Sequence, residues 1–315
     1  MEIANPIYDV VFKYMMEDNK VAKLFLTALS GMDIIDLEFL PQELIGSKEN
    51  LVKHSLGLTV YRLDFSARVR NADGEEKVII IELQKTKMYN DSMRFRKYLG
   101  KQYMNENHFK EFVDNKGRKV KLGLPIFSIY FLGESIATLD NYPVIHIENQ
   151  LKDRYSNERL DFQDDFIKSL YHEGIIVNIS ALRKRRRDEL EKLLEIFDQS
   201  NRTKNVHIMN IIEQEVPEKF RPIIRRLQAA AQVKDVREVM EIEDDFAKEM
   251  LDYELRLVNA ESEKIKVEGE RDYERKMKEE AVWLMIDSGI DKNIISTRLG
   301  LSIEQVDEIN KRKRN

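Results

Sequence analysis

The segment from Lys77 to Gln84 reads Lys-Val-Ile-Ile-Ile-Glu-Leu-Gln, a nearly continuous apolar run of strand length. Such runs are typical of strands buried on both faces, so we expect this segment at the centre of a sheet. It follows the turn-forming sequence Asn71-Ala-Asp-Gly74, and apolar and polar residues are interspersed before that turn, from Leu58 to Arg70. Together the two segments and the turn predict a β-hairpin.

Two carboxylates are expected to meet on one face of this hairpin. If residues 72–74 form a three-residue loop with Gly74 in the left-handed conformation, Asp64 pairs with Glu82. Directly opposed residues place their Cβ atoms about 4.5–5.5 Å apart, where two carboxylates repel each other unless a cation lies between them. Gln84 projects from the same face as Glu82, because side chains alternate along a strand. The hairpin therefore outlines a site for an oxygen-ligated metal ion.

A purely structural interpretation of the two acids is the alternative. Asp64 would then be a polar residue of an edge strand, and Glu82 a solvated residue at a strand end. However, Glu82 ends a run of four aliphatic residues, where an ionised carboxylate is costly unless it is paired or bound to a metal. This cost favours the functional interpretation.

The rest of the first 230 residues predicts an α/β protein. Apolar residues recur at helical spacing in three segments, and two other segments have strand composition. Gly31 is expected to end the first helix and Ser180 to cap a later one. The expected helices lie within 6–30, 88–113 and 165–230, and the expected strands at 124–132 and 142–147.

The C-terminal part has a different composition. Residues 234–280 contain 10 basic and 17 acidic residues and no proline, which predicts an extended, partly coiled-coil helix. Beyond it, Asp291 as an N-cap and Ser302 with Gln305 as a capping box predict a small helix-turn-helix-like unit. We therefore expect four parts, namely a core at 1–150, a helical extension at 151–233, the charged helix at 234–280 and the small unit at 281–315.

Composition restricts the chemistry and the partners. The chain of 315 residues has no Cys, which excludes disulfides and thiolate zinc sites but leaves metals bound by oxygen. It has no leader-like N-terminus and no apolar run long enough to cross a membrane, so a cytoplasmic protein without a membrane partner is expected. The net charge of −5 alone argues against a nucleic-acid partner, but residues 234–280 carry −7 and the rest of the chain +2.

Four motifs together resemble the PD-(D/E)XK nuclease family transposases, also called Rpn-type recombination-promoting nucleases. They are Asn-Pro-Ile-Tyr-Asp-Val-Val-Phe-Lys at 5–13, Arg-Leu-Asp-Phe at 62–65, Ile-Glu-Leu-Gln at 81–84, and Arg94 with Tyr98. Their order and spacing are similar over residues 5–150, with a looser likeness in the C-terminal helices. The resemblance implies a restriction-endonuclease-like core, a mixed central sheet flanked by helices. It also implies a Mg²⁺-dependent DNA endonuclease of recombination or mobile elements, with Mn²⁺ as a substitute and no nucleotide cofactor.

The resemblance also implies roles for individual residues. Asp64 and Glu82 match the two motif acids and would bind Mg²⁺, which polarises the scissile phosphate and lowers the pKa of an attacking water. Gln84 stands where the superfamily has Lys, so it can orient water or phosphate but supplies no positive charge. Asp9 as a further metal ligand and Lys13 as the compensating cation are candidates. Their alternative is an exposed ion pair of residues four apart.

Several interpretations stay open at this point. Arg94 could contact DNA phosphates or only solvate its helix. The basic run from Arg183 to Arg187 is more simply explained as a salt-bridged helix surface, because acidic residues follow it. The charged helix could support a homo-oligomer or fold back on the core. A non-catalytic module that keeps the nuclease fold and binds DNA or protein is the main alternative function, and a regulator acting through its C-terminal unit is a weaker one.

Overall fold

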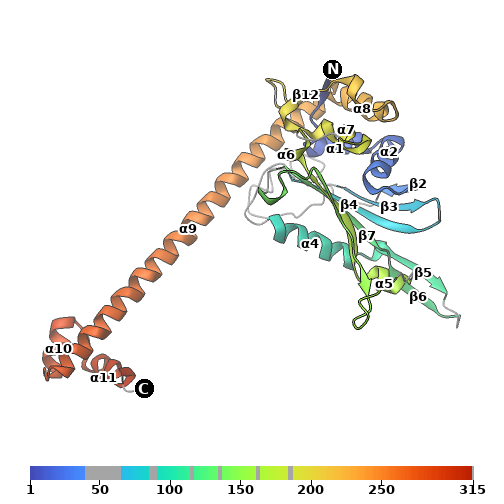
Figure 1. The fold of residues 1–315 in the computed structure, drawn as a ribbon. Coiled ribbons are helices and arrows are strands. Elements are labelled where there is room, and N and C mark those ends of the chain that lie inside the picture. The colour runs from blue at the N-terminus through green and yellow to red at the C-terminus, as the bar shows by residue number, and fades with distance from the viewer. Residues whose placement is uncertain are drawn as a thin grey trace. The chain divides into compact units, whose positions relative to one another are not determined.

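The computed structural model describes residues 1–39, 65–84, 91–113, 117–133, 137–160, 164–183 and 187–313. Its centre is a mixed sheet of six strands in the order β2-β3-β4-β7-β11-β8, with helices on both faces (Figure 1). The α/β class is therefore confirmed. The strands of this sheet are β2 (Ile34–Phe39), β3 (Phe65–Asn71), β4 (Glu76–Gln84), β7 (Ile126–Leu132), β8 (Val144–Ile147) and β11 (His172–Asn178).

The hairpin of β3 and β4 has the predicted turn and register. The N–H of Gly74 donates to the carbonyl of Asn71 at 3.0 Å, and Gly74 has a φ of 84°, in the left-handed region that glycine tolerates. The antiparallel pairs run from Phe65 with Ile81 to Arg70 with Glu76. This register is the one expected from the turn. The part of the predicted strand before Phe65, Asp64 included, lies outside the described residues.

Strand β4 is central, as its apolar sequence predicts. It pairs antiparallel with β3 and parallel with β7, and all of its residues from Val78 to Gln84 are buried. Strand β7 pairs in turn with β11, also in parallel. A strand with neighbours on both edges and cover on both faces exposes almost no backbone, which explains why it needs so little polar sequence.

The two faces of β4 are buried by different helices. Ile79, Ile81 and Leu83 join a core that includes residues of α1 (Asp9–Met16), α2 (Asn19–Ser30) and α8 (Arg221–Gln232). Val78 and Ile80 project from the other face and pack with Leu99 of α4 (Asp91–Met104). Figure 1 shows α4 on one side of the sheet and α1 and α2 on the other. Helix α4, which lies within the segment expected to be helical at 88–113, thus packs on the sheet.

The N-terminal helical segment is two helices rather than one. Asp18 ends the continuity, because its side chain accepts hydrogen bonds from the N–H groups of Lys20 and Val21 and so starts α2 as an N-cap. Gly31 has a φ of 69° and ends α2, as predicted. The break lets α1 and α2 pack separately on the core.

Two segments expected to be helical contain strands instead. The segment predicted as one helix at 88–113 leaves helical structure after Met104, and β5 (Phe109–Val113) pairs with β6 (Lys119–Gly123). Within 165–230, β11 inserts between β7 and β8 in the central sheet. Ser180 is not the predicted N-cap, since it lies inside α6 (Ile179–Leu182) and its hydroxyl donates to Asn178. The conformation of β11 depends on its long-range pairing with β7, which cannot be predicted from the local spacing of apolar residues.

Small elements complete this part of the chain. Strand β1 (Glu2–Ala4) pairs antiparallel with β12 (Ile208–Asn210) and ties the N-terminus to the segment before α8. The others are β9 (Leu151–Lys152), β10 (Arg159–Leu160), α5 (Asp165–Ser169), α7 (Glu189–Leu194) and short 3₁₀ turns.

The chain divides into two compact units, residues 1–248 and 249–315, and the division falls inside the long helix α9 (Lys234–Asp287). In the second unit the end of α9 packs with α10 (Lys292–Leu299) and α11 (Ile303–Lys313) around Val282, Ile295 and Val306. The predicted caps are confirmed, because Asp291 caps α10 and Ser302 and Gln305 exchange hydrogen bonds. A small three-helix arrangement thus ends the chain.

In the described parts of the chain, every helix is too short or too polar to cross a membrane.

Candidate functional site

Glu82 and Gln84 lie at the carboxyl end of β4 and are almost fully buried, with 2% and 4% of their surface exposed. Because side chains alternate along the strand, both lie on the face that carries Val78 and Ile80, which is the face covered by α4. Tyr130 of β7 stands beside Glu82 in the parallel register. The structure thus places a carboxylate and an amide together in buried positions on the face of the sheet against which α4 packs.

Other polar side chains share this face, and the sequence analysis did not single them out. Ser66 of β3, Ser128 of β7 and Asn178 of β11 are each at most 5% exposed, and their register places them on the same side of the sheet as Glu82. The hydroxyl of Ser66 is shielded from solvent and has no hydrogen-bond partner among the described residues. The predicted hairpin register would have found Ser66, which pairs with Ile80, but Ser128 and Asn178 are placed by the long-range pairing of β7 and β11.

The structure does not describe two other side chains of the expected site, those of Asp64 and Arg94. Asp64 lies outside the described residues. Arg94 belongs to α4, which covers the face of Glu82, but its side chain is outside the described part of the structure. In the parts of the chain that are described, no three carboxylate or imidazole groups gather in a cluster suited to a metal ion. Of the two motif acids, Asp64 and Glu82, the structure describes Glu82.

Asp9 and Lys13 form the ion pair expected from their spacing, with Lys13 Nζ 2.5 Å from Asp9 Oδ2 and both side chains about one-third exposed. They lie on α1, and the buried residues of α1 join the core on the face of Ile79 and Ile81. Phe12, for example, contacts the rings of Phe65 and Phe131 there. The structure therefore brings Asp9 and Lys13 to each other, on a helix that packs against the face opposite Glu82 and Gln84.

Asn5 and Tyr8, at the start of the motif at residues 5–13, make structural contacts. Asn5 and Gln199 exchange two side-chain hydrogen bonds, and the Tyr8 hydroxyl donates to the carboxylate of Asp244, 3.0 Å away. Burial and the Asp244 carboxylate raise the pKa of Tyr8, so its hydroxyl stays a donor. His207 also contacts Asp244, through Nε2 at 2.8 Å. These contacts fix the start of α1 against the early turns of α9.

Glu243 of α9 serves as the cap of α1. Its two carboxylate oxygens accept hydrogen bonds from the N–H groups of Asp9 and Val10, at 3.0 and 2.9 Å, while Tyr8 at the N-cap position offers no side-chain cap. Glu243→Ala is expected to lower the free energy of unfolding by about 1–2 kcal/mol, since it removes a charged helix cap. Chemical denaturation measures this change. The control is Glu241→Ala on the exposed side of the same helix, and equal losses in the two variants would contradict the assignment.

His108 predicts how stability depends on pH. The residue is 2% exposed, and burial lowers the pKa of its imidazole below the ordinary value of 6.5, with the Arg68 charge acting in the same direction. The unfolded chain therefore binds the proton more readily, and stability present above pH 6.5 is lost as the pH falls below it. We expect the free energy of unfolding, measured by denaturation at several pH values, to fall less steeply with decreasing pH in His108→Gln. Part of the decline should remain, because burial also lowers the pKa of His172. The control is His146→Gln at an exposed position. If the free energy of unfolding depends on pH as in the wild type in His108→Gln but less steeply in His146→Gln, the assignment is refuted.

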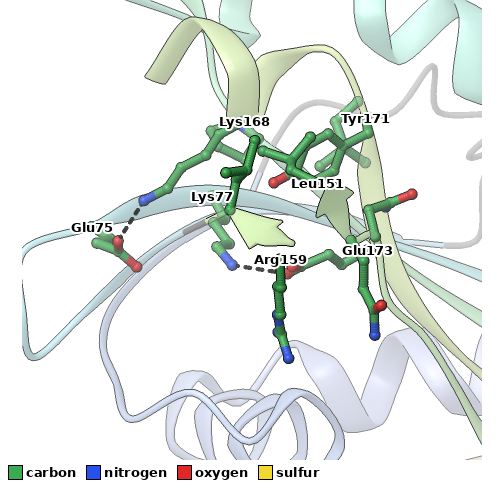
Figure 2. Close-up of a pocket in the computed structure, with 12 residues that line it drawn as sticks. Glu75, Lys77, Leu151, Arg159, Lys168, Tyr171 and Glu173 are labelled. Atoms are coloured by element: carbon green, nitrogen blue, oxygen red, sulfur yellow. Dashed lines mark hydrogen bonds and ion pairs between the residues drawn. The ribbon is translucent and has the colours of Figure 1, made fainter. Parts of the chain in front are cut away.

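A polar pocket lies at the other end of the parallel strands (Figure 2). Lys77 pairs with Glu173 at 3.3 Å, and Lys168 pairs with Glu75 at 3.0 Å, an interaction that lowers the pKa of Glu75. Lys77 precedes Glu82 by five residues, which is about 17 Å along an extended strand. The pocket is therefore separate from the buried Glu82, and four of its charges neutralise one another in pairs.

The basic run at 183–187 is described only at its ends. Arg183 is exposed at the end of α6, and the N–H of Arg187 donates to the buried carboxylate of Glu191 at 2.7 Å. The three residues between them lie outside the described part, so a salt-bridged surface here stays a prediction.

The fold and the buried face define an α/β protein with a mixed six-stranded sheet and a polar position at the carboxyl end of its central strand. Comparison with protein-family models, with curated proteins and with solved structures found no significant match.

Proposed function

We propose that this chain is a Mg²⁺-dependent DNA endonuclease with a restriction-endonuclease-like core. The observation that carries the proposal is the burial of Glu82, which lies at the end of the central strand with 2% of its surface exposed. An ionised carboxylate in such a position needs a counter-charge or a cation. The turn sequence predicts that position 64 lies opposite Glu82, and that position is an aspartate. A setting of recombination or mobile elements rests on the resemblance of the motifs alone.

The donor set fits a hard cation. Asp64, Glu82 and Gln84 offer carboxylate and amide oxygens, the ligands that Mg²⁺ prefers, and the chain has no thiol to compete. When bound, the ion would supply Lewis acidity to the phosphate and lower the pKa of a coordinated water. In this proposal Asp64 and Glu82 hold the ion, and Gln84 orients the water or a phosphate oxygen. Because Gln84 is neutral, a cation for the developing charge must come from elsewhere.

The helix over this face provides a source for that cation. Arg94 lies in α4, which packs on the same side of the sheet as Glu82. By contrast, Lys13 is bound to Asp9 on a helix that packs on the other face. The proposal therefore gives Arg94 the contact with the DNA phosphate and leaves Asp9 and Lys13 as an ion pair of α1.

Cleavage of supercoiled plasmid by the purified protein tests the proposal. We expect nicking with Mg²⁺ or Mn²⁺, none with chelator, and none by a folded Asp64→Ala variant. Deleting residues 281–315 should leave catalysis in place, whereas a regulator acting through its C-terminal unit would lose DNA binding. Metal-independent DNA binding without cleavage on any DNA substrate would overturn the proposal and favour a binding module.

A further inference from the structure

A stripe of apolar and small side chains runs along the part of α9 that belongs to the second unit. Its members recur every three or four residues and fall within an arc of about 120° at 100° per residue. Five of them are large exposed side chains, for example Leu251 at 43%, Ile265 at 69% and Tyr273 at 66%. The stripe consists of Leu251, Leu255, Val258, Ser262, Ile265, Gly269, Tyr273 and Met277.

The two non-apolar members are suited to a helix–helix seam. The hydroxyl of Ser262 donates to the carbonyl of Val258 at 2.8 Å, so it needs no partner outside its own helix. Gly269 is unfavourable inside a helix, and a Cβ added there would meet no atom within 4 Å. The Ser262 hydroxyl therefore brings no unsatisfied donor to the seam, and Gly269 leaves space for a large side chain from a partner.

Charge is distributed unevenly along the same helix. Residues 249–261 carry four carboxylates and one arginine, a net charge of −3. Residues 264–278 carry six basic and four acidic side chains, a net charge of +2. The acidic half of one helix is thus complementary in charge to the basic half of a second copy, whereas two acidic halves or two basic halves repel each other.

We propose that this stripe is the interface of a homodimer in which the α9 helices of two copies pair antiparallel. An antiparallel register places Leu251 against Met277 and Leu255 against Tyr273 of the second copy. Toward the centre, Val258 then faces Gly269 and Ser262 faces Ile265. Each inner layer pairs a larger side chain with a smaller one, as close packing of a seam requires. The acidic half of each helix lies beside the basic half of its partner.

A parallel, in-register pair fits the same residues poorly. It would align the two acidic halves, which repel each other. It would also place Gly269 against Gly269 and Ser262 against Ser262, leaving gaps in the centre of the seam. Charge and packing therefore select the same orientation.

The opposite side of α9 supplies a control surface. Tyr253, Leu257 and Val267 are also exposed, but they lie about 140–180° from the centre of the stripe, and Lys264 interrupts them. Leu255 and Leu257 are then a matched pair, since they are the same residue type, two positions apart and 44% and 47% exposed.

Sedimentation equilibrium of the full chain over a range of concentrations tests the interface. We expect a dimer whose dissociation constant rises roughly tenfold or more in Leu255→Ser, because truncating a buried leucine removes more free energy than a tenfold change requires. Leu257→Ser should leave the dissociation constant nearly unchanged, and circular dichroism should show equal helix content in both variants. A monomeric wild-type chain, or equal effects of the two substitutions, would overturn the proposal.

Disulfide formation tests the orientation, because the natural chain has no cysteine. A mixture of Leu251→Cys and Met277→Cys chains should give a disulfide between the two variants on mild oxidation. Either variant alone should give none within its dimer. Efficient self-crosslinking of Leu251→Cys would indicate a parallel pair and refute the proposed register.

Discussion

Replacing Glu82 with glutamine is expected to lower the rate of the proposed Mg²⁺-dependent DNA cleavage by roughly 100-fold or more, since it removes a ligand of the proposed metal ion. Glutamine keeps the shape of this buried side chain and removes its charge, so the loss of cleavage is compared per folded molecule. Plasmid nicking rates measure the loss, and denaturant unfolding gives the fraction of folded protein.

Glu76→Gln is the control for this substitution. Glu76 begins the same strand and pairs with Lys110 at 3.0 Å, far from the carboxyl end of β4. Its replacement should change the cleavage rate little. If cleavage per folded molecule persists in Glu82→Gln, the Glu82 carboxylate has no catalytic role, whatever the effect of the change on stability.

Gly174→Ala is expected to destabilise the protein by about 3 kcal/mol, at the upper end of overpacking costs. A Cβ at this position would lie 2.3 Å from Ser128 Oγ and 2.4 Å from the Ser128 carbonyl oxygen. The serine side chain could rotate, but the carbonyl belongs to β7, which is paired on both edges with β4 and β11. The sheet must therefore distort to accept the methyl group.

Thermal and denaturant unfolding of Gly174→Ala measure this cost. The matched control is Gly123→Ala in β6, where the nearest atom to an added Cβ is a ring carbon of Phe109 at 3.9 Å, an ordinary contact. We expect the control to stay close to wild type. Wild-type stability in Gly174→Ala would contradict the close approach of β11 to β7.

The elements with strong local signals could be predicted from the sequence. The turn at residues 71–74 and the apolar run at 77–84 define the hairpin, its register and the central strand. Strand β11 could not be found in this way, because its conformation depends on pairing with β7, more than forty residues earlier in the chain. Likewise, the N-terminal segment has helical periodicity on both sides of Asp18, and only the capping bonds reveal the break.

The candidate site was predictable to a similar extent. Alternation along β4 places Glu82 and Gln84 on one face, and the structure adds that this face is buried under α4. Helical spacing gives the ion pair of Asp9 and Lys13, but not the face of the sheet on which α1 packs. The face on which α1 packs depends on which of its side chains reach the core. The spacing of Asp9 and Lys13 alone does not contain this information.

The most direct test of a metal site at Glu82 is a Mn²⁺ titration of the protein with a cleavage-resistant phosphorothioate DNA duplex, followed by the electron paramagnetic resonance signal of free Mn²⁺. The proposed site predicts that the wild-type chain binds Mn²⁺ in competition with Mg²⁺, and that Glu82→Gln loses this binding while remaining folded. Identical titration curves for the wild-type chain and Glu82→Gln would contradict it.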